Sequence, residues 1–298
     1  MSDFRLKVFR SVAKNLSFTK ASQELFVSQP AITKHIQELE AAYQTRLFDR
    51  QGSRISLTES VNLLLEHCER ILEDYKRLEY EMHLLHNEYT GGLKLGASTT
   101  IAQYVLPPLL ASFIGKFPQV SLSLLNGNSR EIEAALQEHR IDLGFVEGVF
   151  RLPNIRYTTF LEDELVAVVR TGSKLAVGEE ITPDELFHLP LVLRERGSGT
   201  LDVFERALQQ HNIKLSSLQV LMYLGSTESI KLFLEHTDCL GIVSVRSITR
   251  ELYSGQLRVV EIKGMPMLRD FSFAQPQGQE SGLAQVFMQF AMHNNHKL

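Results

Sequence analysis

The chain has 298 residues, roughly twice the length of a common single domain, so we expect two domains or a two-lobed domain with an appendage. Its 44% hydrophobic and 22% charged residues exclude a disordered or fibrous protein, and its best apolar run, residues 105–115, is broken by Pro107 and Pro108 and too short for a membrane span. Two cysteines exclude a disulfide framework and a cysteine-rich zinc site; with no apolar leader at the start, they predict a cytoplasmic protein.

Charge is distributed unevenly along the chain, although the net charge of -4 taken alone argues against a nucleic-acid partner. Residues 1–57 hold nine Lys and Arg against five Asp and Glu, a net charge of +4. Residues 58–89 carry a net charge of -5, and residues 90–298 a net charge of -3. A basic first segment on an acidic remainder is a pattern found in DNA-binding proteins.

Three short helices are predicted within residues 1–57. Apolar residues recur at helical spacing over residues 4–13, and a second helix begins near Ser17 and continues to Leu25. The turn that follows leads into a third helix, for which Ser28 is a good N-cap and Pro30 occupies the first turn.

The third helix has one apolar and one polar face. Ile32, Ile36 and Leu39 form an apolar stripe that must pack on the first two helices. The opposite face carries the polar residues and a proline: Gln29, Pro30, Thr33, Lys34 and Gln37. Gln pairs well with adenine and Lys with guanine, so two helices joined by a tight turn with this polar face predict a helix-turn-helix in the major groove. The alternative is an ordinary amphipathic helix with a solvated face.

A small β-hairpin is predicted after the third helix. Residues 46–50 and 54–57 alternate in polarity around a turn that contains Gly52. Arg50 and Arg54 would flank the third helix and contact phosphates or the minor groove. The first segment is therefore predicted to be a winged helix-turn-helix.

Several stretches of this segment resemble the N-terminal signature of LysR-type transcriptional regulators. They are Phe-Thr-Lys-Ala-Ser-Gln-Glu-Leu at 18–25, Val-Ser-Gln-Pro-Ala-Ile-Thr-Lys-His-Ile at 27–36, Leu-Glu at 39–40, Arg-Leu-Phe-Asp-Arg at 46–50 and Leu-Thr-Glu at 57–59. The family usually has a glycine where this chain has Tyr43-Gln44, and Ala-Gly where it has Ser60-Val61. Both departures concern helix boundaries more than DNA contacts.

The resemblance implies that double-stranded operator or promoter DNA is a partner of residues 1–57, here called the head, and that RNA polymerase is another. The residues expected to contact DNA are Thr19, Ser28, Gln29, Pro30, Thr33, Lys34, Gln37, Arg50 and Arg54.

Residues 58–89 are predicted to form one long helix, because they lack glycine and proline and repeat apolar residues at alternating intervals of three and four. A helix of about thirty residues, roughly 45 Å long, needs a partner for its apolar stripe. The preferred partner is a second copy, which the resemblance also implies, giving a homodimer or homotetramer; the alternative is packing on its own chain. The expected dimer contacts are Val61, Leu64, Cys68, Ile71, Tyr75, Leu78, Met82 and Leu85.

Residues 90–298 alternate short apolar strands with helices, which predicts an α/β fold of mostly parallel sheets in two lobes. The expected strands lie near 93–97, 120–124, 141–146, 164–169, 191–193, 220–222 and 241–243. This pattern resembles the effector-binding domain of LysR-type regulators, an architecture shared with periplasmic solute-binding proteins. The resemblance implies a first lobe of residues 90–161 and 266–298 and a second lobe of residues 162–265.

Ligands of such sheets bind at the carboxyl ends of strands, where this sequence places hydroxyl groups, a glutamate and an arginine. The effector candidates are Ser98, Thr99, Thr100, Ser129, Glu147, Arg194, Ser198, Thr200, Ser226 and Thr227. Hydroxyl-rich helix N-termini near an arginine suit a small anion, although Ser and Thr are also ordinary N-caps. Glu147 would repel an anion unless it is paired or protonated, so it is a candidate for setting selectivity.

Other function classes fit less well. Gly197-Ser198-Gly199 lacks the outer glycines of a nucleophile elbow, and no nucleotide-binding loop or metal-ligand spacing is present, so we expect no enzyme, metal or cofactor. A solute-binding protein would not carry the head, and an architectural DNA-binding protein would not need the two lobes. Residues 194–200 are similar to the branch of the family that includes regulators of sulfur assimilation and carbon fixation. The predicted function is ligand-responsive transcription regulation.

Overall fold

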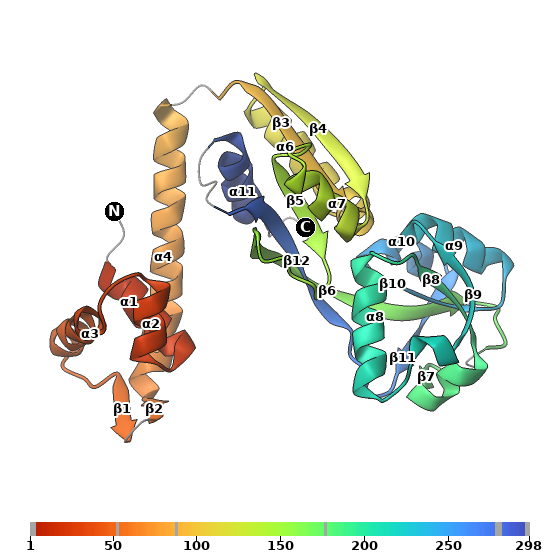
Figure 1. Ribbon diagram of the computed structural model, residues 1–298, viewed down its shortest axis with the longest axis horizontal. Helices are drawn as coiled ribbons and strands as arrows, with labels where there is room; N and C mark the ends of the chain where they lie inside the picture. Colours follow the sequence, from red (N-terminus) through yellow and green to blue (C-terminus); the bar gives the residue numbers. More distant parts are fainter. Residues whose placement is uncertain (1–3, 52–53, 87–88, 176–177, 278–281, 296–298) are drawn as a thin grey trace. The chain divides into compact units, whose positions relative to one another are not determined.

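The computed structural model describes residues 4–51, 54–86, 89–175, 178–277 and 282–295, except for some side chains between residues 49 and 86. The chain divides into two compact units, Met1–Glu88 and Tyr89–Leu298, which are treated separately (Figure 1). The second is called the sensor unit. No helix in the described ranges combines the length and the apolar character that a membrane crossing requires.

The first unit contains three helices, a hairpin and one long helix, which confirms the predicted winged helix-turn-helix. The elements are α1 (Phe4–Asn15), α2 (Phe18–Glu24), α3 (Gln29–Tyr43), β1 (Phe48–Gln51), β2 (Arg54–Leu57) and α4 (Glu59–His86). Ser17 and Ser28 cap α2 and α3 by accepting hydrogen bonds from the backbone N–H groups of Lys20 and Ala31. Gln44 ends α3 in the left-handed region with φ 50°, so the chain keeps the turn at the position where the family usually has glycine.

The core of the first unit is built from the apolar stripes of its helices. Ile32, Ile36 and Leu39 of α3 are buried against α1 and α2, as the spacing predicts. Phe48 of the hairpin packs against Phe9 and Phe18, and its strand is tied to α3 because the Glu40 carboxylate accepts the N–H of Leu47 at 2.8 Å. The α3 helix is therefore held by its apolar face, which leaves its polar face available.

The apolar seam of α4 differs from the prediction in its first half. Val61 and Cys68 are fully buried in the core that α4 shares with α1, and the Cys68 thiol donates a hydrogen bond to the carbonyl of Leu6 at 3.3 Å. These residues face their own chain because the apolar face of α1 also has to be buried, and α4 packs against it. Farther along, Ile71, Leu78 and Met82 are 41%, 53% and 47% exposed, and the Leu85 side chain lies outside the described residues.

The first lobe of the sensor unit is a sheet covered by helices. Its elements are β3 (Gly91–Ser98), α5 (Thr99–Tyr104), α6 (Leu106–Lys116), β4 (Val120–Gly127), α7 (Ser129–Gln137), β5 (Leu143–Glu147), β12 (Leu268–Pro276) and α11 (Leu283–Asn294). β3 pairs in parallel with β4 and β5, and β12 is antiparallel to β5. Two helices rather than one lie between β3 and β4, because Pro107 and Pro108 can occupy only the first turn of a new helix.

The second lobe is also a strand-and-helix sandwich. Its regular elements are β7 (Glu180–Ile181), β8 (Pro190–Arg194), α8 (Gly199–Gln210), β9 (Gln219–Leu224), α9 (Thr227–His236), β10 (Leu240–Ser244), α10 (Thr249–Tyr253) and β11 (Leu257–Ile262), with short 3₁₀ turns η1 (Pro183–His188), η2 (Leu215–Ser217) and η3 (Val245–Ser247). β8 pairs in parallel with β9 and β10. The predicted two-lobed α/β fold is confirmed.

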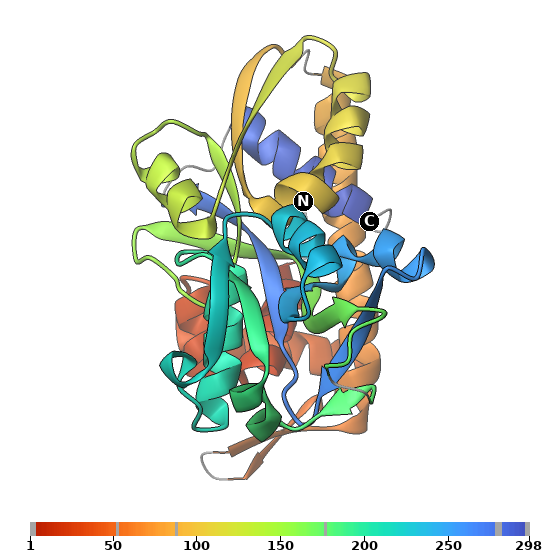
Figure 2. The ribbon, with the colours of Figure 1, turned by 90° about the vertical axis from the view of Figure 1, so that its right-hand side faces the viewer.

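Two long strands connect the lobes. β6 (Ile155–Arg170) pairs with β12 along its first part and with β10 and β11 along its last part. Figures 1 and 2 show β6 and β12 side by side, one leaving the first lobe and the other returning to it. The sequence predicted only the second-lobe part of β6 and neither β11 nor β12. The resulting order is β4-β3-β5-β12-β6-β10-β8-β9.

Candidate functional site

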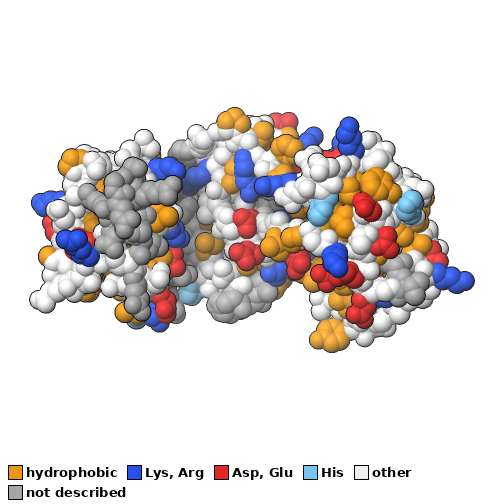
Figure 3. Space-filling model, turned by 90° about the horizontal axis from the view of Figure 1, so that it is seen from below, with side chains coloured by type: hydrophobic (Ala, Val, Ile, Leu, Met, Phe, Trp, Pro, Cys, Tyr) orange, Lys and Arg blue, Asp and Glu red, His pale blue; other side chains and the backbone are white. Residues whose placement is uncertain are grey.

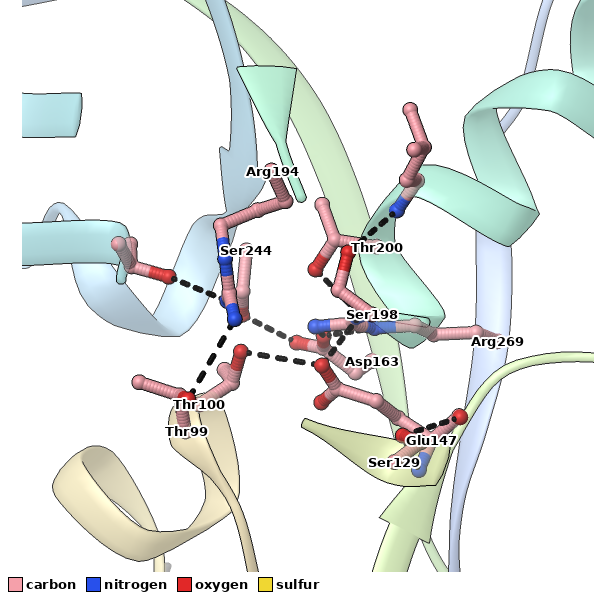
Figure 4. Close-up of polar contacts among 12 residues, drawn as sticks. Thr99, Thr100, Ser129, Glu147, Asp163, Arg194, Ser198, Thr200, Ser244 and Arg269 are labelled. Atoms are coloured by element: carbon pink, nitrogen blue, oxygen red, sulfur yellow. Dashed lines mark hydrogen bonds and ion pairs between the residues drawn. The ribbon is translucent and has the colours of Figure 1, made fainter. Parts of the chain in front are cut away.

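Polar residues from both lobes meet where strands end and helices begin. β3 ends at Ser98, and Thr99 and Thr100 begin α5; β5 ends at Glu147; in the second lobe, Thr200 lies in the first turn of α8. All five side chains are buried. Figure 4 shows these strand ends and helix starts converging on one group of polar side chains.

Glu147 is the acceptor at the centre of this group. The Thr100 hydroxyl donates to its Oε1 at 3.3 Å, and Nη1 of Arg269 lies 3.2 Å from the same oxygen. The Ser129 hydroxyl donates to the Glu147 carbonyl at 2.8 Å, which fixes the end of β5 against α7. Ser129 therefore positions Glu147 through its backbone, while Asn128 caps α7.

Arg269, on β12, joins the lobes and was missed by sequence reasoning. Its Nε and Nη2 both lie 2.7 Å from Oδ2 of Asp163, and its Nη1 donates to the Thr200 hydroxyl at 3.0 Å. Ser244 donates to the other Asp163 oxygen at 2.7 Å. We call Thr100, Glu147, Asp163, Thr200, Ser244 and Arg269 the Arg269 cluster.

A second arginine lies close to this cluster and also contacts both lobes. The Nη2 atom of Arg194, which is 1% exposed, donates to the Thr99 hydroxyl of the first lobe at 3.4 Å and to the Gly225 carbonyl of the second at 3.3 Å. Its Nη1 donates to Thr227 at 3.5 Å, and Glu195 pairs with it through two contacts of 2.8 and 3.0 Å. This guanidinium is thus placed among helix N-termini and held by a half-buried carboxylate.

The lobes are also joined beside α9. The Tyr104 hydroxyl of α5 donates to the Glu228 carboxylate, and buried Lys231 lies 2.7 Å from Glu228 and 2.9 Å from Glu251. Burial and the bond to Glu228 raise the pKa of Tyr104 far above its usual value, so this hydroxyl remains a donor.

Gly199 permits a close backbone approach between the lobes. A Cβ on Gly199 would lie 2.5 Å from the carbonyl carbon of Glu147, a separation that real Cβ atoms do not show. Only glycine at the start of α8 therefore allows this helix to reach the end of β5.

A cavity of about 360 Å³ adjoins the Arg269 cluster. It is lined by residues of both connecting strands, the loop after β5 and α8, namely Gly148, Val149, Arg151, Glu162, Asp163, Arg206, Leu268, Arg269 and Asp270. In the space-filling view, acidic and basic side chains are intermixed over the face shown (Figure 3).

Three buried polar atoms of the site have no hydrogen-bond partner in the part of the chain that the structure describes: the Ser98 hydroxyl, Oε2 of Glu147 and Nη2 of Arg269. The Arg269 atom still lies 2.7 Å from Oδ2 of Asp163 as an ion pair. Buried polar groups are nearly always paired in folded proteins, so the Ser98 hydroxyl and Oε2 of Glu147 mark unmet hydrogen bonds in this arrangement.

The structure brings most of the effector candidates together. Thr99, Thr100, Glu147, Arg194 and Thr200 belong to the contacts above, as does Thr227, whereas Ser198 and Ser226 serve as N-caps of α8 and α9. Arg269 could have been found, since Met267, Phe271 and Phe273 at alternating positions predict a buried strand face that also includes position 269.

The DNA candidates lie on α2, α3 and the hairpin. Thr19, Ser28, Gln29, Pro30, Lys34 and Gln37 are exposed and Thr33 is half-buried, while the side chains of Arg50 and Arg54 lie outside the described residues. The exposed set includes the polar face of α3, whose side chains are free of the core and can donate and accept hydrogen bonds.

Neither cysteine is poised for redox chemistry. Burial raises the pKa of Cys68 to about 11 and that of Cys239 to about 11, so both thiols are protonated near neutral pH. Within the described residues, no group of three or more His, Cys, Asp or Glu is arranged to hold a metal ion.

Comparisons with known proteins match both units. A family model described as "Bacterial regulatory helix-turn-helix protein, lysR family" matches residues 4–60, and one described as "LysR substrate binding domain" matches residues 86–295. The chain is 35% identical to the "Uncharacterized HTH-type transcriptional regulator YeiE" of Escherichia coli (strain K12), covering 87% of this chain and 85% of the relative. It is 30% identical to the "RuBisCO operon transcriptional regulator" of Acidithiobacillus ferrooxidans, covering 96% and 92%.

A solved structure, the Synechocystis CcmR regulatory domain in complex with 2-PG, is similar with a TM-score of 0.62 and 27% identity, covering 68% of this chain and 97% of that domain.

Proposed function

The chain belongs to the LysR family of transcriptional regulators, and on that premise we propose how its parts divide the function. As a regulator it is not an enzyme; it binds DNA and, through its two-lobed domain, a small-molecule effector. In our proposal, residues 1–57 contact the operator, residues 58–89 pair with a second copy, and residues 90–298 sense the effector. Effector binding between the lobes changes the relative placement of paired heads and so their contacts with promoter and RNA polymerase.

Pairing through α4 is supported by the exposed Ile71, Leu78 and Met82, which continue the apolar seam beyond the part buried against α1. A homodimer or homotetramer would cover these side chains, which are costly to leave in water. Val61 and Cys68 support the pairing only indirectly, by fixing α4 on the head.

We propose that the effector is a small anion. The observation that carries this is Arg194, a buried guanidinium that contacts Thr99 from one lobe and Thr227 from the other. Its partner Glu195 is 26% exposed, so an anion can replace that carboxylate while keeping the charge balanced. The 2-PG complex of the CcmR domain supports this ligand class.

The effector site is tested at Ser98 and Thr100. Ser98→Ala and Thr100→Ala should abolish the rise in melting temperature of the full-length protein with phosphate or 2-PG, because each removes a hydroxyl at the start of α5. Operator affinity without ligand should remain unchanged. Ser121→Ala, whose hydroxyl lies on exposed β4, is the matched control. A normal shift in both site variants contradicts this placement.

The DNA interface is tested with four substitutions in the head. Gln29→Ala or Lys34→Ala should relax operator specificity by about 1–3 kcal/mol at one base position, because these side chains read base edges. Arg50→Ala or Arg54→Ala should weaken binding to all sequences alike and reduce the slope of log affinity against log salt by about 1. Binding titrations on operator and scrambled DNA at several salt concentrations measure both effects; four variants with unchanged affinity and preference would sink the assignment.

A further inference from the structure

Glu147 is an unusual residue to find at an anion site. Its carboxylate is buried where the first turns of α5 and α8 meet, and one of its two oxygens already accepts Thr100 and Arg269. The other, Oε2, is buried without a hydrogen-bond partner in the described structure. A carboxylate oxygen is only an acceptor, so the missing partner must be a donor.

The arginines that contact the site are already paired with carboxylates. Arg269 is shared between Glu147 and Asp163, Arg246 lies 3.7 Å from the other Asp163 oxygen, and Arg194 is paired with Glu195. The Glu147 carboxylate thus has only a share of the Arg269 guanidinium. A fully deprotonated anion placed beside Oε2 would meet negative charge with no hydrogen to share, and a buried like-charge contact of this kind strongly disfavours binding.

The hydroxyl of Ser98 completes the pattern. It is 1% exposed, does not cap α5 and has no hydrogen-bond partner in the described ranges. A serine hydroxyl can donate to an anionic oxygen, whereas Glu147 can only receive a proton donor. Ser98 and Glu147 end the paired strands β3 and β5, so the two unmet atoms lie at the same edge of the sheet. A single ligand that satisfied both would need an oxygen that accepts a hydrogen bond and a group that donates one.

We propose that the effector is an anion that also carries a hydrogen-bond donor, either a retained acidic proton or a hydroxyl group, and that Glu147 selects it through Oε2. This inference rests on the proposed effector site between the lobes and adds a selection rule to it. Oxyanions that retain a proton and hydroxylated carboxylates satisfy the rule. Sulfate and simple carboxylates do not.

Two matched pairs of anions test the rule in the full-length protein at pH 7.5. Phosphate and sulfate share a tetrahedral shape, but only phosphate keeps a proton; glycolate and acetate are both carboxylates, but only glycolate has a hydroxyl. Titration calorimetry should find the donor-bearing member bound about 100-fold more tightly in at least one pair, because a buried group left unpaired by a ligand is costly.

Glu147→Gln should remove that preference or reverse it, since an amide both accepts and donates and carries no charge. Glu133→Gln is the matched control: Glu133 is also a buried carboxylate of the first lobe, but it accepts the Tyr157 hydroxyl at 2.6 Å outside the Arg269 cluster. This control should keep the wild-type preference. Even if Glu147→Gln does not fold, the wild-type titrations still test the selection rule.

The other results separate the failures. Equal affinity for both members of each pair in the wild type overturns the selection rule and leaves the anion site standing. A preference that survives in Glu147→Gln overturns the role of Glu147, as does a variant that binds all four anions more tightly by one common factor, which would make Glu147 a mere competitor. Absence of binding by all four anions contradicts the proposed anion site itself.

Discussion

Gly199→Ala is expected to abolish the response to effector while the protein still folds and binds operator DNA. The added Cβ would clash with the carbonyl group of Glu147, and backbone atoms cannot move to relieve the clash as a flexible side chain can. The start of α8 must therefore move away from the end of β5, which separates Thr200 from Arg269 and Glu147. Affinity for the anions that the wild type binds should fall at least about tenfold, because the two halves of the site are not assembled together. Calorimetry on the full chain measures this.

The control for this variant is Gly115→Ala. Gly115 lies in α6, outside the site, and a Cβ there has no atom within 4 Å. Its anion affinity should match the wild type. If Gly199→Ala binds anions as the wild type does, the close approach of α8 and β5 has no part in sensing.

Arg269→Met is expected to be among the most destabilising single substitutions in the sensor unit. It removes the cation that holds Glu147 and Asp163 and leaves two buried carboxylates without it. Breaking a buried pair by removing one partner costs about 3–5 kcal/mol. Urea unfolding of the full-length protein, followed by a signal from the sensor unit, should show the midpoint falling accordingly.

Two comparisons isolate the cause of this loss. Arg140→Met removes an exposed pair with Glu138 at 2.7 Å and should cost no more than about 1 kcal/mol. Adding Glu147→Gln to Arg269→Met should restore part of the lost stability, since Glu147 loses the arginine that contacts it, whereas Asp163 keeps Arg246 at 3.7 Å. If Arg269→Met alone is as stable as the wild type, the Arg269 cluster does not stabilise the lobes.

The head could be predicted closely because its signals are local. Ser28 and Pro30 mark the start of α3, and the stripe from Ile32 to Leu39 defines its buried face within a dozen residues. The same kind of pattern was ambiguous in α4. Regular apolar spacing predicts that a stripe is buried, but it does not say which partner buries it. Only three-dimensional packing shows that Val61 and Cys68 turn toward α1.

The first half of β6 could not be predicted because its partner strand is remote in sequence, whereas β12 has an alternating apolar pattern that sequence reasoning missed. The first half of β6 contains Arg156, Thr158 and Thr159, which give no alternating apolar signal, and it is a strand because β12 pairs with it more than a hundred residues later. Without β12, the sequence could place Glu147 at the site but not its cation. The sequence therefore predicted the hydroxyl groups of the candidate site and Arg194. It did not predict the buried charged residues Asp163 and Arg269.

The register of the two connecting strands has a mechanical consequence. Asp163 and Arg269 are directly opposite each other in the β6–β12 ladder, the part of the sheet that any rotation of one lobe against the other must twist. The strands that connect the lobes thus carry an ion pair, and its guanidinium extends to Glu147. We expect a ligand that changes the hydrogen bonding of Glu147 to act directly on the Arg269–Asp163 pair, and through it on the angle between the lobes.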